Sequence, residues 1–272
     1  MASVMLLSVV LATSGHAQQS PTPAPSPAGI TTNQALAISV HNPFEEFVKA
    51  PIQSTTGFEL GPHHKVGNTE NVEPLVPFSL NSNWDLIARP SLNVTYLPGP
   101  HEQSGLQDLQ TSFFLTPAKA NTWFWGAGPI MQFPTASSSE LGSGRWSAGP
   151  TAAMAYMDGP WSDTILGYQL MSYAGNHARG SVNQTYIEPE ISYNFESGWY
   201  VQCNPQMTFD WSADASDGWT IPMGADVGKA FTIGSHSLSL QVGAYDLLKR
   251  ENGAPQWIAR VSVTFLFPAG TK

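Results

Sequence analysis

Charged residues and cysteine are both scarce in this sequence. Lys, Arg, Asp and Glu make up 11% of the 272 residues, against roughly 25% in ordinary soluble domains. Cys203 is the only cysteine, so no disulfide can form within the chain, and a metal site built from several cysteines is excluded. The formal net charge of −9 argues against a nucleic-acid partner, because nucleic acids are bound through clusters of Lys and Arg.

Long apolar runs are also missing after the first residues of the chain. No stretch of 18 or more consecutive apolar residues follows them, which argues against membrane-spanning helices. Residues 1–17, MASVMLLSVVLATSGHA, contain a short apolar core and end in Gly-His-Ala, as secretory signal peptides do. Residues 18–32 are rich in Pro, Ser and Ala and predict an extended linker. We therefore expect an exported protein.

Residues 199–212, WYVQCNPQMTFDWS, alternate between two kinds of side chain. Every second residue from Trp199 to Trp211 is apolar, apart from Pro205, and the residues between them are mostly polar. Successive side chains of a β-strand point to opposite faces, so this stretch predicts one apolar and one polar face. It is longer than the roughly 5–6 residues typical of soluble sheets. A strand that crosses a bilayer needs about 9–11 residues with aromatic residues at both interfaces, which this stretch has.

The same pattern recurs about twelve times and predicts an all-β fold, a closed antiparallel transmembrane β-barrel over residues 52–268. Short turns alternate with longer polar loops, as periplasmic turns and external loops do in outer-membrane barrels, so both termini are expected in the periplasm. Closure follows because an open sheet edge cannot lie in hydrocarbon. The expected strands are 52–61, 70–80, 84–97, 105–115, 122–133, 146–157, 161–173, 182–195, 199–212, 219–232, 237–247 and 256–267.

Tryptophans begin many of these strands at both ends of the expected barrel. Amphipathic indole rings favour the boundary between lipid and water, so these positions predict two aromatic girdles. The predicted girdle residues are Trp84, Trp123, Trp146, Trp161, Trp199, Trp211, Trp219 and Trp257.

Two features fit the alternation poorly. Lys229 falls on the predicted lipid face of strand 219–232, which requires either a β-bulge or a position near the headgroups. Prolines also recur inside the predicted strands, where each removes a ladder hydrogen bond, and no sequence pattern explains them. They stand at positions 74, 90, 129, 150, 189, 205 and 222.

A short helical segment is expected before the barrel, within residues 33–51. Asn42 can cap a helix, Pro43 suits its first position, and Glu45 completes a variant capping box. Such a helix can either enter the barrel mouth as a plug or pack beneath the barrel, and we expect the second arrangement.

Several stretches of the sequence resemble one bacterial family. It is the family of outer-membrane proteins known as "MetA-pathway of phenol degradation" proteins, many of which carry the misleading label "neuromedin U". The resemblance implies an outer-membrane barrel with a transport role, loosely linked to the uptake of aromatic compounds, without a catalytic motif or a cofactor. The last strand resembles the signal read by the barrel assembly machinery, although Phe267 is followed by PAGTK. The similar stretches are 77–90, 106–121, 125–136, 141–150, 194–200, 219–231 and 265–268.

The alternation also predicts which charged side chains face the lumen. A barrel of about twelve strands is narrower than the 16–18-stranded porins. These charges can therefore form a selective constriction, in which case their acid excess predicts a preference for cations. Alternatively they pair with each other and with Gln110, Gln202 and Gln206 and fill the interior, which we slightly favour. The predicted lumen residues are Glu73, Asp85, Arg89, Asp108, Glu188, Glu190, Asp210, Asp226 and Arg260.

A hydrolase and an adhesive barrel are the alternatives to a channel. A hydrolase needs a Ser hydrogen-bonded to a His base, and no predicted strand places a His beside a Ser, so we expect neither catalysis nor a metal site. An adhesive barrel would act through its loops, but the longest, 134–145, is rich in Ser and Gly and lacks aromatic residues. The sequence thus predicts a passive channel or transporter for small solutes, with outer-membrane lipid as its surroundings, and the family resemblance implies that these solutes are hydrophobic or aromatic.

Overall fold

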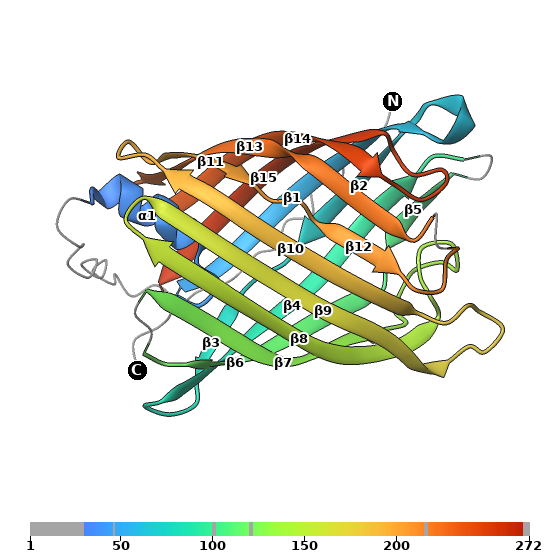
Figure 1. Ribbon diagram of the computed structural model, residues 1–272, viewed down its shortest axis with the longest axis horizontal. Helices are drawn as coiled ribbons and strands as arrows, with labels where there is room; N and C mark the ends of the chain where they lie inside the picture. The colour runs from blue at the N-terminus through green and yellow to red at the C-terminus, as the bar shows by residue number, and fades with distance from the viewer. Residues whose placement is uncertain (1–29, 46, 100–101, 120–121, 215–216, 269–272) are drawn as a thin grey trace.

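The computed structural model describes residues 30–45, 47–99, 102–119, 122–214 and 217–268. The expected signal peptide (1–17) and most of the expected linker (18–32) lie outside these ranges. The described elements, drawn in Figure 1, are α1 (Thr32–His41), β1 (Phe47–Leu60), the 3-10 turn η1 (Gly61–His63), β2 (Lys65–Val72), β3 (Val76–Ser79), β4 (Trp84–Leu97), β5 (Gln103–Leu106), β6 (Leu109–Pro117), β7 (Trp123–Phe133), β8 (Arg145–Asp158), β9 (Trp161–Gly175), β10 (Asn183–Asn194), β11 (Trp199–Cys203), β12 (Met207–Asp210), β13 (Trp219–Ile233), β14 (His236–Lys249) and β15 (Trp257–Pro268).

The strands form one closed antiparallel barrel, which confirms the predicted fold. Three barrel strands are interrupted, because β2 continues as β3, β5 as β6 and β11 as β12, so the described strands occupy twelve positions. β15 closes the barrel by pairing with β1, from Phe47 opposite Pro268 to Phe58 opposite Trp257. The first strand therefore begins at Phe47 and not at residue 52. Its first residues, 47–51, fall within the segment 33–51 that was expected to be helical.

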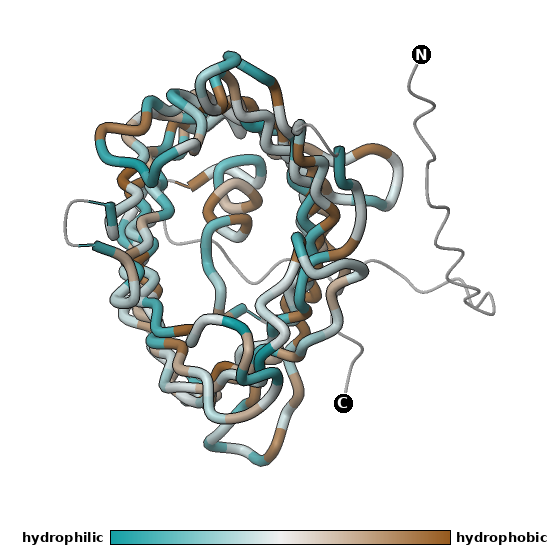
Figure 2. The backbone as a smooth tube through the Cα atoms, turned by 90° about the vertical axis from the view of Figure 1, so that its right-hand side faces the viewer, coloured by the Kyte–Doolittle hydropathy of each residue, from teal (hydrophilic) through white to brown (hydrophobic). Residues whose placement is uncertain are grey.

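The two faces of the sheet are the reverse of those in a soluble protein. Large apolar side chains are exposed on the outer surface, and many buried side chains are polar, including Arg260, Asn194 and Asp226. This is the arrangement expected of strands that face lipid outside and a polar lumen inside. Figure 2 looks along the barrel and shows the open ring of strands with α1 inside it.

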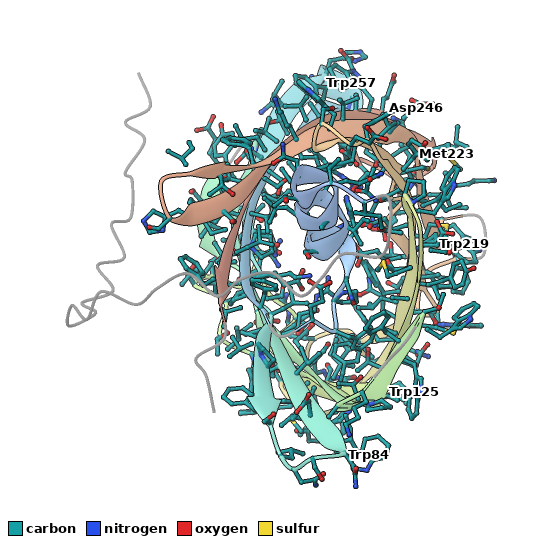
Figure 3. The ribbon with its side chains drawn as sticks, turned by 90° about the vertical axis from the view of Figure 1, so that its left-hand side faces the viewer. Trp84, Trp125, Trp219, Met223, Asp246 and Trp257 are labelled. Carbon is teal, nitrogen blue, oxygen red and sulfur yellow. The ribbon has the colours of Figure 1, made fainter. Side chains whose placement is uncertain are left out.

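The predicted girdle tryptophans lie on the outer surface of the barrel, where Trp84 is half-buried and the others are exposed. Trp84, Trp219 and Trp257 are labelled on the outside of the wall in Figure 3. Trp125, which was not predicted, is also exposed there and packs edge-on against Trp84 at 6.1 Å between ring centroids. It follows Trp123 by two residues, so the period of two would have identified it.

Lys229 and the strand prolines both have structural explanations. The β13–β14 ladder is regular at Lys229, and its ammonium lies 5.2 Å from the ring centroid of Trp199, so the position beside the girdle accounts for it. Pro129 and Pro150 stand opposite one another across β7 and β8, where neither has an N–H to donate. Pro74 and Pro205 lie in the interruptions between β2 and β3 and between β11 and β12, where the flanking registers bring them to the level of Pro90 and Pro189, and Pro222 lies at a β-bulge.

The helix differs from the prediction in both boundaries and position. Thr31 is its N-cap and accepts a hydrogen bond from the Gln34 amide at 3.2 Å, whereas Asn42 is its C-cap. The capping box was wrong because the Asn42 side chain instead accepts from the Phe44 amide at 3.0 Å, in a turn that ends the helix. α1 also lies inside the barrel, not beneath it, with Ala37 fully buried.

The described residues contain no helix long and apolar enough to cross a membrane.

Candidate functional site

An ion pair crosses the lumen halfway along the barrel. Arg89 Nη2 on β4 lies 2.9 Å from Glu73 Oε2, which follows β2, and 3.3 Å from Glu188 Oε2 on β10. Four strands separate β4 from β10 around the shorter side of the barrel. The guanidinium therefore joins opposite walls and is shared between two carboxylates.

Amides and a second arginine extend this bridge. Asn204 Nδ2 and Gln206 Nε2 donate to Glu188 Oε1 at 3.3 and 3.2 Å. Arg260 Nη1 in turn donates to the Asn204 carbonyl at 2.9 Å. We call the connected set Glu73, Arg89, Glu188, Asn204 and Arg260 the polar belt. It runs across the lumen from β15 to the end of β2.

Four members of the polar belt directly precede a strand proline. The dipeptides are Glu73-Pro74, Arg89-Pro90, Glu188-Pro189 and Asn204-Pro205. Proline holds the preceding residue in an extended conformation and interrupts the ladder beside it. The interruptions in β2/β3 and β11/β12 therefore lie where the polar side chains enter the lumen. This dipeptide pattern is the sequence signal that could have identified the site.

A cavity of about 140 Å³ lies between the polar belt and α1. Its walls are of two kinds, and the apolar one belongs to a buried cluster around Ile87 and Phe114. The apolar wall consists of Phe44, Leu75, Ile87, Phe114, Ala153 and Leu166, and the polar wall of His41, Lys49, Arg89, Glu188, Glu190 and Asn204. Apolar cavities of about 150 Å³ in proteins can bind benzene, so this one has room for a single aromatic ring.

Side chains of the barrel hold α1 in place at the short-turn end. Lys49 Nζ donates to the carbonyls of Ser39 and Asn42 at the C-terminal end of the helix, where the helix dipole favours a positive charge. Gln34 Nε2 donates to the Asn194 carbonyl at 2.7 Å. Lys49 was missed by the sequence analysis, because residues up to 51 were expected to be helical.

His41 of α1 meets Glu190 and Ser192 of β10, a contact that the sequence analysis did not anticipate because it considered only histidines placed by strands. His41 Nδ1 lies 2.9 Å from Glu190 Oε1 and 3.4 Å from Ser192 Oγ. A catalytic relay needs the Ser and the acid at opposite ring nitrogens, whereas here both approach Nδ1. Ser192 is also completely buried. We therefore interpret the contacts of His41 with Glu190 and Ser192 as holding the helix against β10.

Asp226 and Arg260 are close but not directly paired. The Tyr245 hydroxyl and Gln202 Nε2, the latter at 3.3 Å, donate to Asp226 Oδ2. The Arg260 guanidinium lies over the Tyr245 ring, 4.0 Å from its centroid. Tyr245 thus separates the two charges and contacts both.

The remaining predicted lumen residues lie away from the polar belt. Asp108 accepts hydrogen bonds from the Ser143 amide (2.7 Å), the Ser143 hydroxyl (2.8 Å) and the Ala136 amide (3.0 Å), which anchors the longest loop. Asp85 accepts from Ser79 Oγ at 2.7 Å near the short turns, and Asp210 accepts from the amide of residue 212 at 2.7 Å near the loops. Asp226 thus connects to the polar belt through Tyr245, whereas Glu190, Asp85, Asp108 and Asp210 make separate contacts.

No cluster of His, Cys, Asp and Glu within the described ranges is placed to hold a metal ion.

No protein-family model and no curated protein matches the sequence. Solved structures match its fold. The COG4313 outer membrane channel from Pseudomonas putida F1 is 16% identical, with a TM-score of 0.60 over 81% of this chain and 95% of that chain. The NanC porin is 11% identical, with a TM-score of 0.51 over 80% of this chain and 98% of that chain. At these identities the similarity establishes the fold, a barrel of the outer-membrane type.

Proposed function

We propose that the protein is an outer-membrane channel for the passive passage of small, weakly polar or aromatic molecules. Support comes from the apolar outer surface, the two tryptophan girdles and the fold similarity to outer-membrane channels. The sequence resemblance to the phenol-degradation family agrees with this function, and we propose membership of that family. Lipid of the outer membrane surrounds the barrel, and the barrel assembly machinery inserts it through β15.

The cavity beside the polar belt is the observation that carries this proposal. Its volume of about 140 Å³ suits one aromatic ring, the apolar wall suits the ring face, and the polar wall suits a hydroxyl or carboxylate substituent. The belt and α1 leave little room for larger hydrophilic solutes. We therefore assign α1 the role of a plug that a solute must pass.

The electrostatics of the lumen suggest a modest ion preference. The predicted lumen residues contain more carboxylates than cations. Lys49, which is also buried in the lumen, lowers this excess of negative charge. The Arg89 guanidinium is neutralised by the two carboxylates beside it. Removing the plug should therefore expose a wider pore with a weak preference for cations.

Single-channel conductance in planar bilayers tests this function. We expect small discrete steps from the purified, refolded protein in simple salts, and interruption of these steps by phenol and by toluate. A variant lacking residues 30–42 should give larger steps. Phe114→Ala should weaken the block by phenol, because it removes an aromatic face of the cavity.

A matched control is Phe267→Ala, which removes an aromatic side chain from the outer surface and should leave the block unchanged. Heat-modifiable gel mobility would verify that every variant retains a closed barrel. Bilayers that stay silent with both the intact protein and the variant lacking residues 30–42 would refute the channel.

A further inference from the structure

The backbone hydrogen-bond ladder of the barrel wall has a gap between β10 and β13, which, among the described residues, only side chains of Asn204 and Gln206 bridge to β10. β10 pairs with β11 up to Ile191 and with β12 from Ile187, with no ladder between these positions. β13 pairs with β11 and with β12 but not with the segment Asn204–Gln206 that joins them. Figure 1 shows β11 and β12 as separate arrows on this side of the barrel. The joining segment has therefore left the sheet on both of its edges.

The segment Asn204–Gln206 is displaced towards the lumen. The Asn204 amide donates to the Tyr245 hydroxyl at 3.1 Å, and its carbonyl accepts from Arg260. Both partners are inward-pointing side chains of β14 and β15, not backbone groups of a neighbouring strand. Pro205 is buried, although the alternation would direct it towards lipid. Side chains within the barrel thus hold the segment in place of the ladder.

The position of the gap makes it relevant to the bilayer. Pro205 lies midway between Trp199 and Trp211, the girdle residues at the two ends of this strand. Backbone that is unpaired at membrane depth is tolerated only where it is buried in protein or lines a cavity. Pro205 has no N–H to donate, and the registers of β10 with β11 and with β12 bring it to the level of Pro189, which has none either. The gap in the ladder therefore lies at the depth of the hydrocarbon and is specified by the sequence.

The inner and outer sides of the gap differ in chemistry. On the inside, Glu188 and Asn204 line the cavity beside the polar belt. On the outside, the exposed side chains are Ile191 (57% exposed) and Met223 (47% exposed), the latter labelled in Figure 3. Methionine side chains are flexible and readily give way to an apolar neighbour. One unpaired segment thus separates the cavity from an apolar, adaptable patch on the outer surface.

We propose that this gap is a lateral portal through which an apolar solute leaves the cavity for the bilayer. The proposal rests on the channel function above and adds the route and the substrate property that the route requires. A solute without charge gains free energy when it moves from a half-polar cavity into hydrocarbon. Ions and strongly polar solutes cannot take this route and are confined to the axis of the barrel.

Disulfide staples beside the gap test the portal. Ile191→Cys places a thiol directly opposite the native Cys203, and Val201→Cys with Val227→Cys in a Cys203→Ser background joins directly opposed residues of β11 and β13. Antiparallel partners have Cα atoms about 4.5–5.5 Å apart, which lies within the range for a disulfide. The assay is the entry of radiolabelled toluene into outer-membrane vesicles, with ion conductance measured in parallel. We expect each oxidised staple to abolish the protein-dependent toluene entry, with ion conductance unchanged and entry restored by dithiothreitol.

Two controls separate the portal from other effects of a staple. Val242→Cys with Val261→Cys, in a Cys203→Ser background, joins exposed partners of β14 and β15 away from the gap and should have no effect. Where a staple prevents folding, the double change P189V and P205V restores both N–H groups and should also reduce entry. Its matched control is P129V with P150V.

The outcomes are distinguishable. Toluene entry that continues with the disulfide formed would overturn the portal and leave the channel standing. A parallel loss of toluene entry and ion conductance would also overturn it, because the staple would then act on the axial path. Absence of protein-dependent toluene entry in the unstapled protein would instead count against the proposed function itself.

Discussion

Arg89 is the residue on which the polar belt depends most. Its side chain is 15% exposed, and those of its partners Glu73 and Glu188 are 22% and 14% exposed, so all three charges are largely removed from water. A buried charge stays favourable only while its partners are present. The belt is therefore stable as a set and sensitive to the loss of its single shared cation.

Arg89→Gln should lower the free energy of unfolding by about 3–5 kcal/mol, because it leaves two buried carboxylates without their cation. It should also increase the preference of the pore for cations. Urea unfolding followed by heat-modifiable mobility measures the first effect, and reversal potentials in a salt gradient measure the second. The control is Arg145→Gln, whose half-buried side chain bonds to carbonyls of residues 179 and 180 in the loop between β9 and β10. Equal effects of the two changes would contradict the role given to Arg89.

At the scale of elements, Lys49 is the barrel side chain that bonds the free carbonyls at the C-terminal end of α1, where Glu190 and Ser192 also contact His41. Lys49→Met keeps an unbranched side chain but removes the ammonium that bonds the carbonyls of Ser39 and Asn42. We expect the plug to leave its place more often, so that Cys at the fully buried position of Ala37 reacts faster with a maleimide. Lys229→Met serves as the control, because Lys229 lies on the outer surface beside Trp199. An unchanged labelling rate would show that Lys49 does not retain the helix.

Asp108 is one of several residues that anchor the longest loop, 134–144, and it does so through its carboxylate. Asp108 accepts three hydrogen bonds from this loop, and Asp108→Asn leaves one acceptor oxygen where there were two. We expect the anchoring to weaken by about 1–3 kcal/mol, and proteolysis of the loop to accelerate. Asp85→Asn at the opposite end of the barrel should not affect the loop. Equal proteolysis rates for the two variants would show that the loop is held by other contacts.

How far the sequence predicts the elements depends on how local their signals are. The twelve strand positions and their faces could be predicted, because a period of two in apolar residues requires only neighbours along the chain. The start of the helix was misplaced because Asn42, Pro43 and Glu45 match the sequence pattern of a capping box. In the structure Asn42 instead ends α1 and accepts a hydrogen bond from the Phe44 amide. Four members of the polar belt were predicted to face the lumen, but which of them pair could not be predicted, because Arg89 and Glu188 are 99 positions apart and meet only through the curvature of the closed barrel.

The same limit applies to the prolines. Each proline looks unfavourable alone, and only the strand register reveals that Pro129 faces Pro150 and that Pro74 and Pro205 lie in interruptions of their strands. The dipeptides of a polar residue followed by proline are nevertheless visible in the sequence. Their recurrence in four strands would have indicated that the interruptions and the lumen charges belong to one site.

At the scale of the whole molecule, the alternation of short turns and long loops gives the barrel a direction. α1 enters the barrel from the short-turn end, where its Thr31 hydroxyl donates to the Glu196 carbonyl at 2.5 Å. The loop 134–144 lies at the other end. If the short turns face the periplasm, the plug closes the channel from the inside of the cell envelope, and solutes arriving from outside meet the loops first.

Cysteine labelling on intact cells checks this orientation. In a Cys203→Ser background, Ser139→Cys in the long loop should react with a membrane-impermeant maleimide, and Ser235→Cys in a short turn should react only after the cells are lysed. Both serines are exposed, so a difference in labelling reports the side of the membrane and not burial. The reverse result would place α1 at the cell surface. The plug would then meet incoming solutes first, and the cavity would be reached only after the helix had moved.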